Sequence, residues 1–168
     1  MDMFIEKIVK RRKSMTVMIG TSLIVSAAFV VSFFLILYLQ DLSLILVVGV
    51  IYLAYFLISN RNIEFEYAVT NGDLDIDKIV NQKKRKRVFS SNCKEFEIVA
   101  RVNSDKYTKE IKECKKVLDF TSHAKEKAND AWFIFMRKES APTVIIFEPN
   151  SQMIDNFFTF NPRKVFRN

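Results

Sequence analysis

The chain has few of the residues on which most enzyme sites depend. Its 168 residues include one histidine, two cysteines and three glycines. A single histidine, His123, cannot form the histidine cluster of a metal site or proton relay. Three glycines leave little backbone to cradle a phosphate group, and no GxSxG, P-loop or GxGxxG pattern occurs. We therefore expect a protein that is not an enzyme and that holds no metal and no cofactor.

The two cysteines, Cys93 and Cys114, have neither the spacing of a redox motif nor that of a zinc site. In the cytoplasmic location argued below, we expect them to be reduced and buried. Cys93 and His123 would suit a nucleophile and its base, but no third orienting group is indicated.

Asp73, Asp75 and Asp77 superficially resemble a calcium loop. An EF-hand needs a glycine after the third acid, whereas Gly72 precedes all three. Their alternation predicts a solvated strand face, which can pair with the basic residues that follow.

Charge is absent from two long stretches near the N-terminus. Residues 14–40 carry no charged side chain, nor do residues 42–60, and Asp41 separates them. As helices, the first would be about 40 Å long and the second close to the minimum for a membrane span. A cleaved signal peptide has a shorter apolar core. The sequence therefore predicts a transmembrane helical hairpin over residues 14–60.

The predicted spans contain no ionisable residue, although such groups usually mark a transport or proton pathway. We therefore interpret the hairpin as an anchor. Small residues recur four apart, at Ser22 and Ser26 and at Ala28 and Ser32, a spacing that lets helix backbones approach closely. We expect them to pack near Gly49 or Ala54 within the hairpin, or against a second copy.

Lysine and arginine flank the predicted spans unevenly. Residues 1–13 contain five of them, the turn contains none, and Arg61 begins a lysine-rich region. The positive-inside rule therefore places both termini in the cytoplasm of a cell-membrane protein. Residues 1–13 then form a basic cytoplasmic segment, either as a short amphipathic helix on the inner leaflet or as a frayed terminus.

After Arg61 the hydrophobic period becomes two. Ile63, Phe65 and Tyr67 alternate with polar residues, which predicts a half-buried strand. Asn71-Gly72 predicts a type I′ turn to a second strand through Leu74 and Ile76. Five further strands are expected at 85–90, 96–102, 117–121, 132–138 and 143–148, with a loop or short surface helix over 105–116.

A helix is expected at the C-terminal end, where Asn150 or Ser151 serves as its N-cap and Pro162 ends it. The aromatic residues of the last two strands are expected in the core, because aromatic side chains suit a pleated, half-buried surface. These residues are Trp132, Phe133, Phe135 and Phe147.

Seven strands and a helix predict an α+β fold: an antiparallel β sandwich or partly open barrel over residues 61–168, with a C-terminal capping helix. This order resembles the pleckstrin-homology-like superfold, including its bacterial members joined to paired transmembrane helices. The segments EFEYAVTNGDLDIDKIV, KKRKR and NPRKVF resemble a family of small two-helix membrane proteins of Gram-positive bacteria. The resemblance covers most of the chain and implies a fold and a location, but no activity.

The densest charge in the chain is a basic run at residues 83–87, composed of Lys83, Lys84, Arg85, Lys86 and Arg87. Tethered near the inner leaflet, such a run would attract anionic lipid headgroups at about 1 kcal/mol per residue. The alternative is a solvated hairpin tip or a protected edge strand. Phosphoinositide-binding pleckstrin domains keep their basic residues mainly around the first hairpin turn, which is acidic here, so specific recognition of that lipid is not expected. Nucleic acid is not expected either, because the other charges are mixed and few aromatics flank the run.

We therefore expect a membrane-anchored, non-enzymatic interaction module that binds a protein or anionic lipid at the inner leaflet. The alternative is an accessory subunit of a larger membrane complex, assembled through the transmembrane hairpin.

Overall fold

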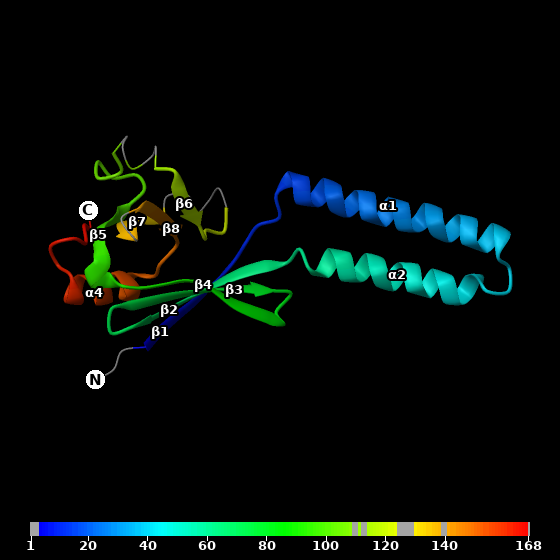
Figure 1. Cartoon of the computed structure of the whole chain (residues 1–168), viewed down its shortest axis with the longest axis horizontal. Coiled ribbons are helices and arrows are strands. Elements are labelled where there is room, and N and C mark those ends of the chain that lie inside the picture. Colours follow the sequence, from blue (N-terminus) through cyan, green and yellow to red (C-terminus); the bar gives the residue numbers. More distant parts are fainter. Residues whose placement is uncertain (1–3, 109–110, 112–113, 124–129, 139–140, 168) are drawn as a thin grey trace. The chain divides into compact units, whose positions relative to one another are not determined.

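The computed structural model describes residues 4–108, 111, 114–123, 130–138 and 141–167 (Figure 1). In chain order the elements are β1 (Phe4–Lys10), α1 (Met15–Tyr38), α2 (Ser43–Ser59), β2 (Ile63–Thr70), β3 (Asp73–Val80), β4 (Lys84–Asn92), the short 3₁₀ turn η1 (Cys93–Glu95), β5 (Phe96–Arg101), β6 (Lys116–Asp119), β7 (Trp132–Lys138), β8 (Ala141–Phe147) and α4 (Ser151–Phe160). The chain divides into two compact units. One comprises Met1–Arg12, Glu64–Ile79 and Arg85–Asn168, and the other comprises Lys13–Ile63 and Val80–Lys84.

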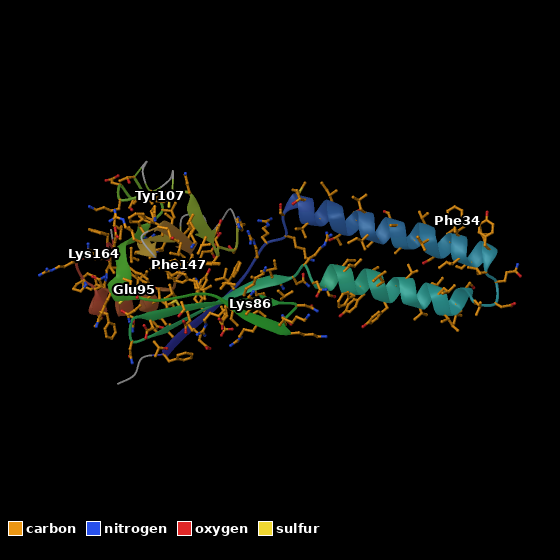
Figure 2. All side chains as sticks on the ribbon, viewed as in Figure 1. Phe34, Lys86, Glu95, Tyr107, Phe147 and Lys164 are labelled. Atoms are coloured by element: carbon orange, nitrogen blue, oxygen red, sulfur yellow. The ribbon has the colours of Figure 1, made fainter. Side chains whose placement is uncertain are left out.

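The second unit contains α1 and α2, which lie side by side (Figure 1). Within the described part of the chain, α1 is the one helix long and apolar enough to cross a membrane, and α2 is a shorter apolar helix of 17 residues. No residue of α1 is buried, and large apolar side chains such as Phe34 are exposed (Figure 2). The predicted apolar N-terminal helix is therefore confirmed, while crossing of the membrane by α1 and by α2 stays a prediction.

The described strands of the first unit form two four-stranded sheets, in the orders β1-β2-β3-β4 and β5-β7-β8-β6. β1 pairs antiparallel with β2, and Phe4 lies opposite Thr70 while Lys10 lies opposite Glu64. In the other sheet, β6 runs parallel to β8. The prediction of an all-antiparallel sheet is wrong here, because the β7–β8 hairpin places β8 beside β6 and returns it in the same direction as β6.

Strand β1 is the main departure from the sequence prediction. A short amphipathic helix or a frayed terminus was expected at residues 1–13, but Phe4–Lys10 forms a strand, so both expectations are wrong for these residues. Ile5 and Val9 are buried, whereas Phe4 and Ile8 are exposed. Residues four apart share a face in a helix and in a strand, so this pattern fits both. The segment forms a strand because β2 supplies a backbone partner for every residue of β1.

The predicted turn and capping helix are both present. Asn71 and Gly72 have positive φ angles of 50° and 88°, as a type I′ turn requires. The Asn150 side chain caps α4 by accepting a hydrogen bond from the Met153 backbone N–H, at 2.8 Å. Helix α4 then packs on the core, where the ring of Phe157 lies edge-on to that of Phe96 at 5.7 Å.

The predicted core aromatics lie largely where expected. Trp132, Phe133 and Phe147 are buried, whereas Phe135 is only half-buried. Tyr67 meets Phe147 edge-on at 5.7 Å, which brings β2 of one sheet against β8 of the other. The shared core is therefore aromatic, and its two sheets pack face to face under α4.

Candidate functional site

The basic run begins at a turn and continues into β4, whose alternation separates its side chains. Arg85 and Arg87 point to the face that carries the carboxylates of β2 and β3. Arg85 Nη2 lies 2.5 Å from Glu66 Oε2. Arg87 lies 2.9 Å from Asp75 and 3.0 Å from Asp77, and the Asp77 hydrogen bond raises the pKa of Arg87.

These two arginines form ion pairs within the domain. Glu66 is only 4% exposed, and a buried carboxylate is costly unless a cation or hydrogen bonds compensate it. Arg85 provides that compensation, and Arg87 does the same for Asp77. The predicted pairing of the aspartate face with the basic run is therefore confirmed.

The three lysines of the run remain available to a partner. Lys83, Lys84 and Lys86 are exposed, as Figure 2 shows for Lys86, and no ion pair joins them to any residue in the described ranges. The surface that the run offers to a ligand is therefore a cluster of three lysines, which we call the lysine cluster.

The turn before β4 holds Lys83 and Lys84 near the end of α2. Asn81 and Gln82 both have positive φ, and the Asn81 N–H donates to the carbonyl oxygen of Asn62 at 2.9 Å. Asn62 follows the last residue of α2, Ser59, by three positions. This contact joins the turn to the end of α2, and the sequence contains no signal for it beyond the tolerance of asparagine for positive φ.

The small residues expected to pack between helices differ in how far α1 and α2 cover them. Ser22 and Ser26 are exposed, and a Cβ added to Gly49 would meet nothing within 4 Å. The half-covered residues recur every three or four positions, at Val17, Gly20, Thr21, Ile24, Ala28, Ser32 and Leu35 of α1 and at Ser43, Val47, Val50, Ala54 and Ile58 of α2. The half-covered set therefore contains Ala28, Ser32 and Ala54 but not Ser22, Ser26 or Gly49.

Sequence reasoning missed a close approach at Gly20. The guanidinium of Arg61 lies against α1 there, where its Nη1 donates to the carbonyl oxygen of Val17 at 3.5 Å. A Cβ on Gly20 would come within 2.5 Å of that nitrogen. Gly20 thus gives Arg61 room to join the end of α2 to the beginning of α1.

The other candidates are held by structural contacts. Asp73 accepts a hydrogen bond from Asn92 at 2.6 Å. The His123 ring lies 2.7 Å from Arg11 and 3.5 Å from Asp119, whereas Cys93 is buried with its N–H bonded to Gly72. Across the described ranges, no three His, Cys, Asp or Glu side chains gather as metal ligands would.

Glu148 and Tyr67 form a buried polar cluster that the sequence did not indicate. The Tyr67 hydroxyl donates to the carbonyl oxygen of Phe120 at 2.6 Å, and burial raises the pKa of Tyr67. Glu148 Oε1 accepts from both the N–H and the hydroxyl of Ser122, at 2.9 and 2.7 Å. The cluster holds the end of β8 against β2.

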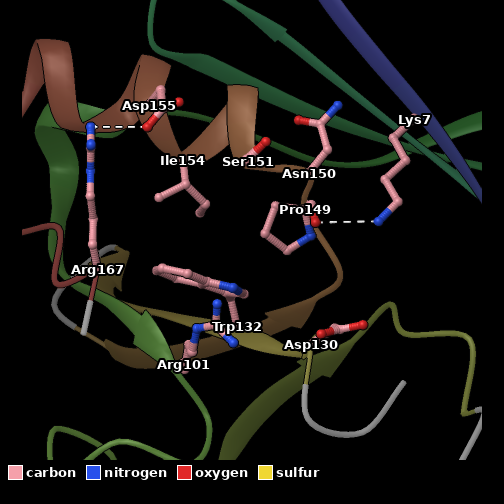
Figure 3. Close-up of a pocket in the computed structure, with 10 residues that line it drawn as sticks. All are labelled: Lys7, Arg101, Asp130, Trp132, Pro149, Asn150, Ser151, Ile154, Asp155 and Arg167. Atoms are coloured by element: carbon pink, nitrogen blue, oxygen red, sulfur yellow. Dashed lines mark hydrogen bonds and ion pairs between the residues drawn. The ribbon is translucent and has the colours of Figure 1, made fainter. Parts of the chain in front are cut away.

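A crevice of 310 Å³ lies between β1, β7 and the N-terminal end of α4 (Figure 3). Its cations are largely engaged: Lys7 donates to the carbonyl oxygen of Pro149 at 3.2 Å, and Arg167 lies 3.1 Å from Asp155. Arg101 lies over the Trp132 ring at 5.6 Å. The crevice offers a mixed-charge binding surface with no paired nucleophile and base.

The chain is similar to a known protein family. The family model described as a bacterial PH-like domain (DUF6106) matches residues 1–167. No curated protein and no solved structure matches the chain. The matched range includes β1, in agreement with the pairing of β1 and β2.

Proposed function

The chain belongs to the bacterial PH-like domain family, and from that membership we propose that it is a membrane-anchored interaction module without enzymatic activity. PH-like domains are generally non-enzymatic and often bind lipids or proteins. The proposed protein spans the cell membrane twice, keeps both termini in the cytoplasm and uses its lysine cluster on anionic headgroups of the inner leaflet. A protein partner would be held at the same surface.

The pairing of β1 with β2 supports an even number of crossings. β1 precedes α1 in the chain and β2 follows α2, yet the two strands pair along all seven residues of β1. A single sheet lies on one side of a bilayer. If α1 crosses, α2 must therefore return, although its 17 residues span only about 26 Å and require the bilayer to thin slightly.

The observation that carries the lipid-contact proposal is the hydrogen bond between Asn81 and Asn62. Because Asn62 closely follows α2, this bond keeps Lys83 and Lys84 near the point where the proposed span ends. Within a Debye length of about 8 Å, anionic headgroups attract such lysines strongly. The charge asymmetry of the flanking segments supports the cytoplasmic side.

Lysine footprinting of the full-length protein in nanodiscs tests this contact without any mutation. An amine-reactive ester would be applied in neutral and in anionic nanodiscs across a salt series, with the modification at each lysine measured by mass spectrometry. Reduced modification of Lys83, Lys84 and Lys86 is expected in anionic nanodiscs at low salt, with recovery at high salt.

Exposed lysines elsewhere in the domain serve as internal controls. Lys94 and Lys164 are exposed and lie outside the basic run, so their modification should be the same in both nanodiscs. Equal modification of the lysine cluster in neutral and anionic nanodiscs would refute the lipid contact and leave the protein partner as the remaining interaction.

A second proposal is an accessory subunit assembled through α1 and α2. It is favoured by the open positions of Ser22, Ser26 and Gly49, which face away from the contact within the pair. Small residues that are open on a membrane helix suit close contact with another helix. A bulky Gly49→Phe change should then dissociate the complex, detected by crosslinking in membranes, and should leave the lysine footprint unchanged.

A further inference from the structure

The sheet β5-β7-β8-β6 is apolar on both faces. Its inner face contributes Ile134 and Ile145 to the core beneath α4, and both are fully buried. The outer face carries Phe133 and Val144, which are equally buried, together with the half-buried Phe135. A sheet with one solvated face normally alternates apolar and polar residues, so this outer face requires a cover.

Part of that cover comes from the segment that follows β5. The ring of Tyr107 lies 4.7 Å from that of Phe133, and Ile111 is buried over Ala100 and Val144. Phe166, near the C-terminus, packs on the same cluster. The cover closes over the middle of the sheet but leaves a cavity beside it.

The cavity has a volume of 700 Å³, within the range of about 300–1,000 Å³ typical of small-molecule sites. Its lining comprises Ile98, Thr108, Ile111, Cys114, Lys115, Lys116, Phe135, Arg137, Ala141 and Pro142. Among the described residues of this lining, the charged side chains are three cations, Lys115, Lys116 and Arg137. An apolar cavity bordered by cations is complementary to a molecule with one long apolar chain and one anionic end.

We propose that this cavity binds a long-chain fatty acid, with the chain against Ile98 and Phe135 and the carboxylate between Lys115, Lys116 and Arg137. Arg137 is 65% exposed and lies 3.8 Å from Glu97, a long separation that leaves its guanidinium open to a ligand. Guanidinium and carboxylate groups form paired hydrogen bonds, which favours a carboxylate head. The site is independent of the lysine cluster and of membrane attachment.

Cys114 is a natural reporter for this site, because it lines the cavity and its thiol donates to the Pro142 carbonyl oxygen at 3.0 Å. Cys93 is an internal reference, since it is fully buried and burial raises the pKa of its thiol. Full-length protein in neutral nanodiscs would be alkylated with a small maleimide, with and without palmitate. Peptide mass spectrometry then gives a separate rate for each cysteine.

Palmitate at about ten times its dissociation constant should slow alkylation of Cys114 roughly tenfold, because all but about a tenth of the sites are then occupied. Hexadecanol, which has the same chain but no charge, should protect much less. Arg137→Glu should weaken protection by palmitate and, as a change at an exposed residue, should leave the fold intact. Ala141→Trp should remove protection by filling the cavity.

Slow alkylation of Cys93 in each variant reports that the fold is retained. An unchanged Cys114 rate in the presence of palmitate would overturn the proposal. Equal protection by palmitate and hexadecanol, or full protection by palmitate in Arg137→Glu, would overturn the assignment of the cations to a carboxylate. Failure of these tests would not affect the footprint of the lysine cluster.

Discussion

The two sheets share one core but differ in what their outer faces present. The outer face of β1-β2-β3-β4 carries ion pairs, with Glu66 beneath Arg85 and Asp77 beside Arg87. The outer face of β5-β7-β8-β6 carries buried aromatic and aliphatic side chains, with Phe133 at its centre. On the first face, the buried carboxylates are compensated once their ion pairs form. On the second face, the apolar side chains are shielded from water only where another segment of the chain or a ligand covers them.

This difference shows how two sheets of similar size acquire different roles. Paired charges hold Glu66 and Asp77 at a modest net gain, because desolvation offsets most of the attraction between the charges. Apolar burial is worth about 25 cal/mol per Å² and does not depend on partner geometry. The apolar outer face should therefore contribute more to stability and also offer the better small-molecule site.

The largest loss of stability on either outer face is expected at Phe133. Phe133→Ala should lower the free energy of unfolding by about 3–5 kcal/mol, because it empties a fully buried site beneath Tyr107. Chemical denaturation followed by fluorescence of Trp132, the only tryptophan, measures this loss. Val117→Ala, at an exposed position of β6, is the matched control and should cost far less. A small loss at Phe133 would mean that the outer face is not a packed layer.

Removing a cation tests the charged face. Arg85→Ala should cost about 1–3 kcal/mol, because Glu66 then remains buried without a charged partner. Adding Glu66→Gln to Arg85→Ala should recover part of the loss, since a neutral amide is cheaper to bury. If the double variant were no more stable than Arg85→Ala alone, the cost would not come from the orphaned carboxylate.

The contribution of the core between the two sheets can be tested through the buried hydroxyl of Tyr67. Because burial raises its pKa in the folded protein above the unfolded value of about 10, its neutral form stabilises the fold below that pH. Stability should therefore fall as the pH rises above 10, when the unfolded chain ionises more readily. Tyr67→Phe should cost about 1 kcal/mol at pH 7 through the lost bond to Phe120 and should show a shallower alkaline decline. Thermal unfolding between pH 7 and 11 measures both effects.

The smallest effect is expected at Lys10. Its ammonium lies 3.9 Å from Glu64 and its side chain is 71% exposed, so Lys10→Ala should change stability by less than about 0.5 kcal/mol. Denaturation at low and high salt measures this change, which should vanish at high salt. A loss as large as that of Arg85→Ala would show that exposed and buried pairs on this face do not differ.

Much of the charged sheet could be predicted because its signals are local. The Asn71-Gly72 turn, the alternating aspartates and the basic run each occupy a few consecutive residues. The pairing of Arg87 with Asp75 and Asp77 follows from that alternation. What could not be predicted is the hydrogen bond between Asn81 and Asn62, since that contact joins segments about 20 residues apart through backbone atoms alone.

The apolar sheet was predicted as strands and core, but its two-sided character was missed. The run from Trp132 to Met136 has no polar residue on either parity, which is the pattern of a strand buried on both faces. The cover was missed because residues 105–116 are rich in charge, and the apolar contacts of its described residues include those of Tyr107, Ile111 and Cys114. The cavity depends on how far that cover reaches, a property of tertiary packing.

The placement of β1 ahead of the helices has a consequence for synthesis in the cell. Its seven residues are made before both helices, but the edge of β2 that accepts them emerges only after both helices have been translated. The N-terminal strand must therefore stay unpaired while the helices are made and can close the sheet only afterwards. Pairing of β1 with β2 thus reports that the intervening helical segment is finished, and it can precede the synthesis of β3 to α4.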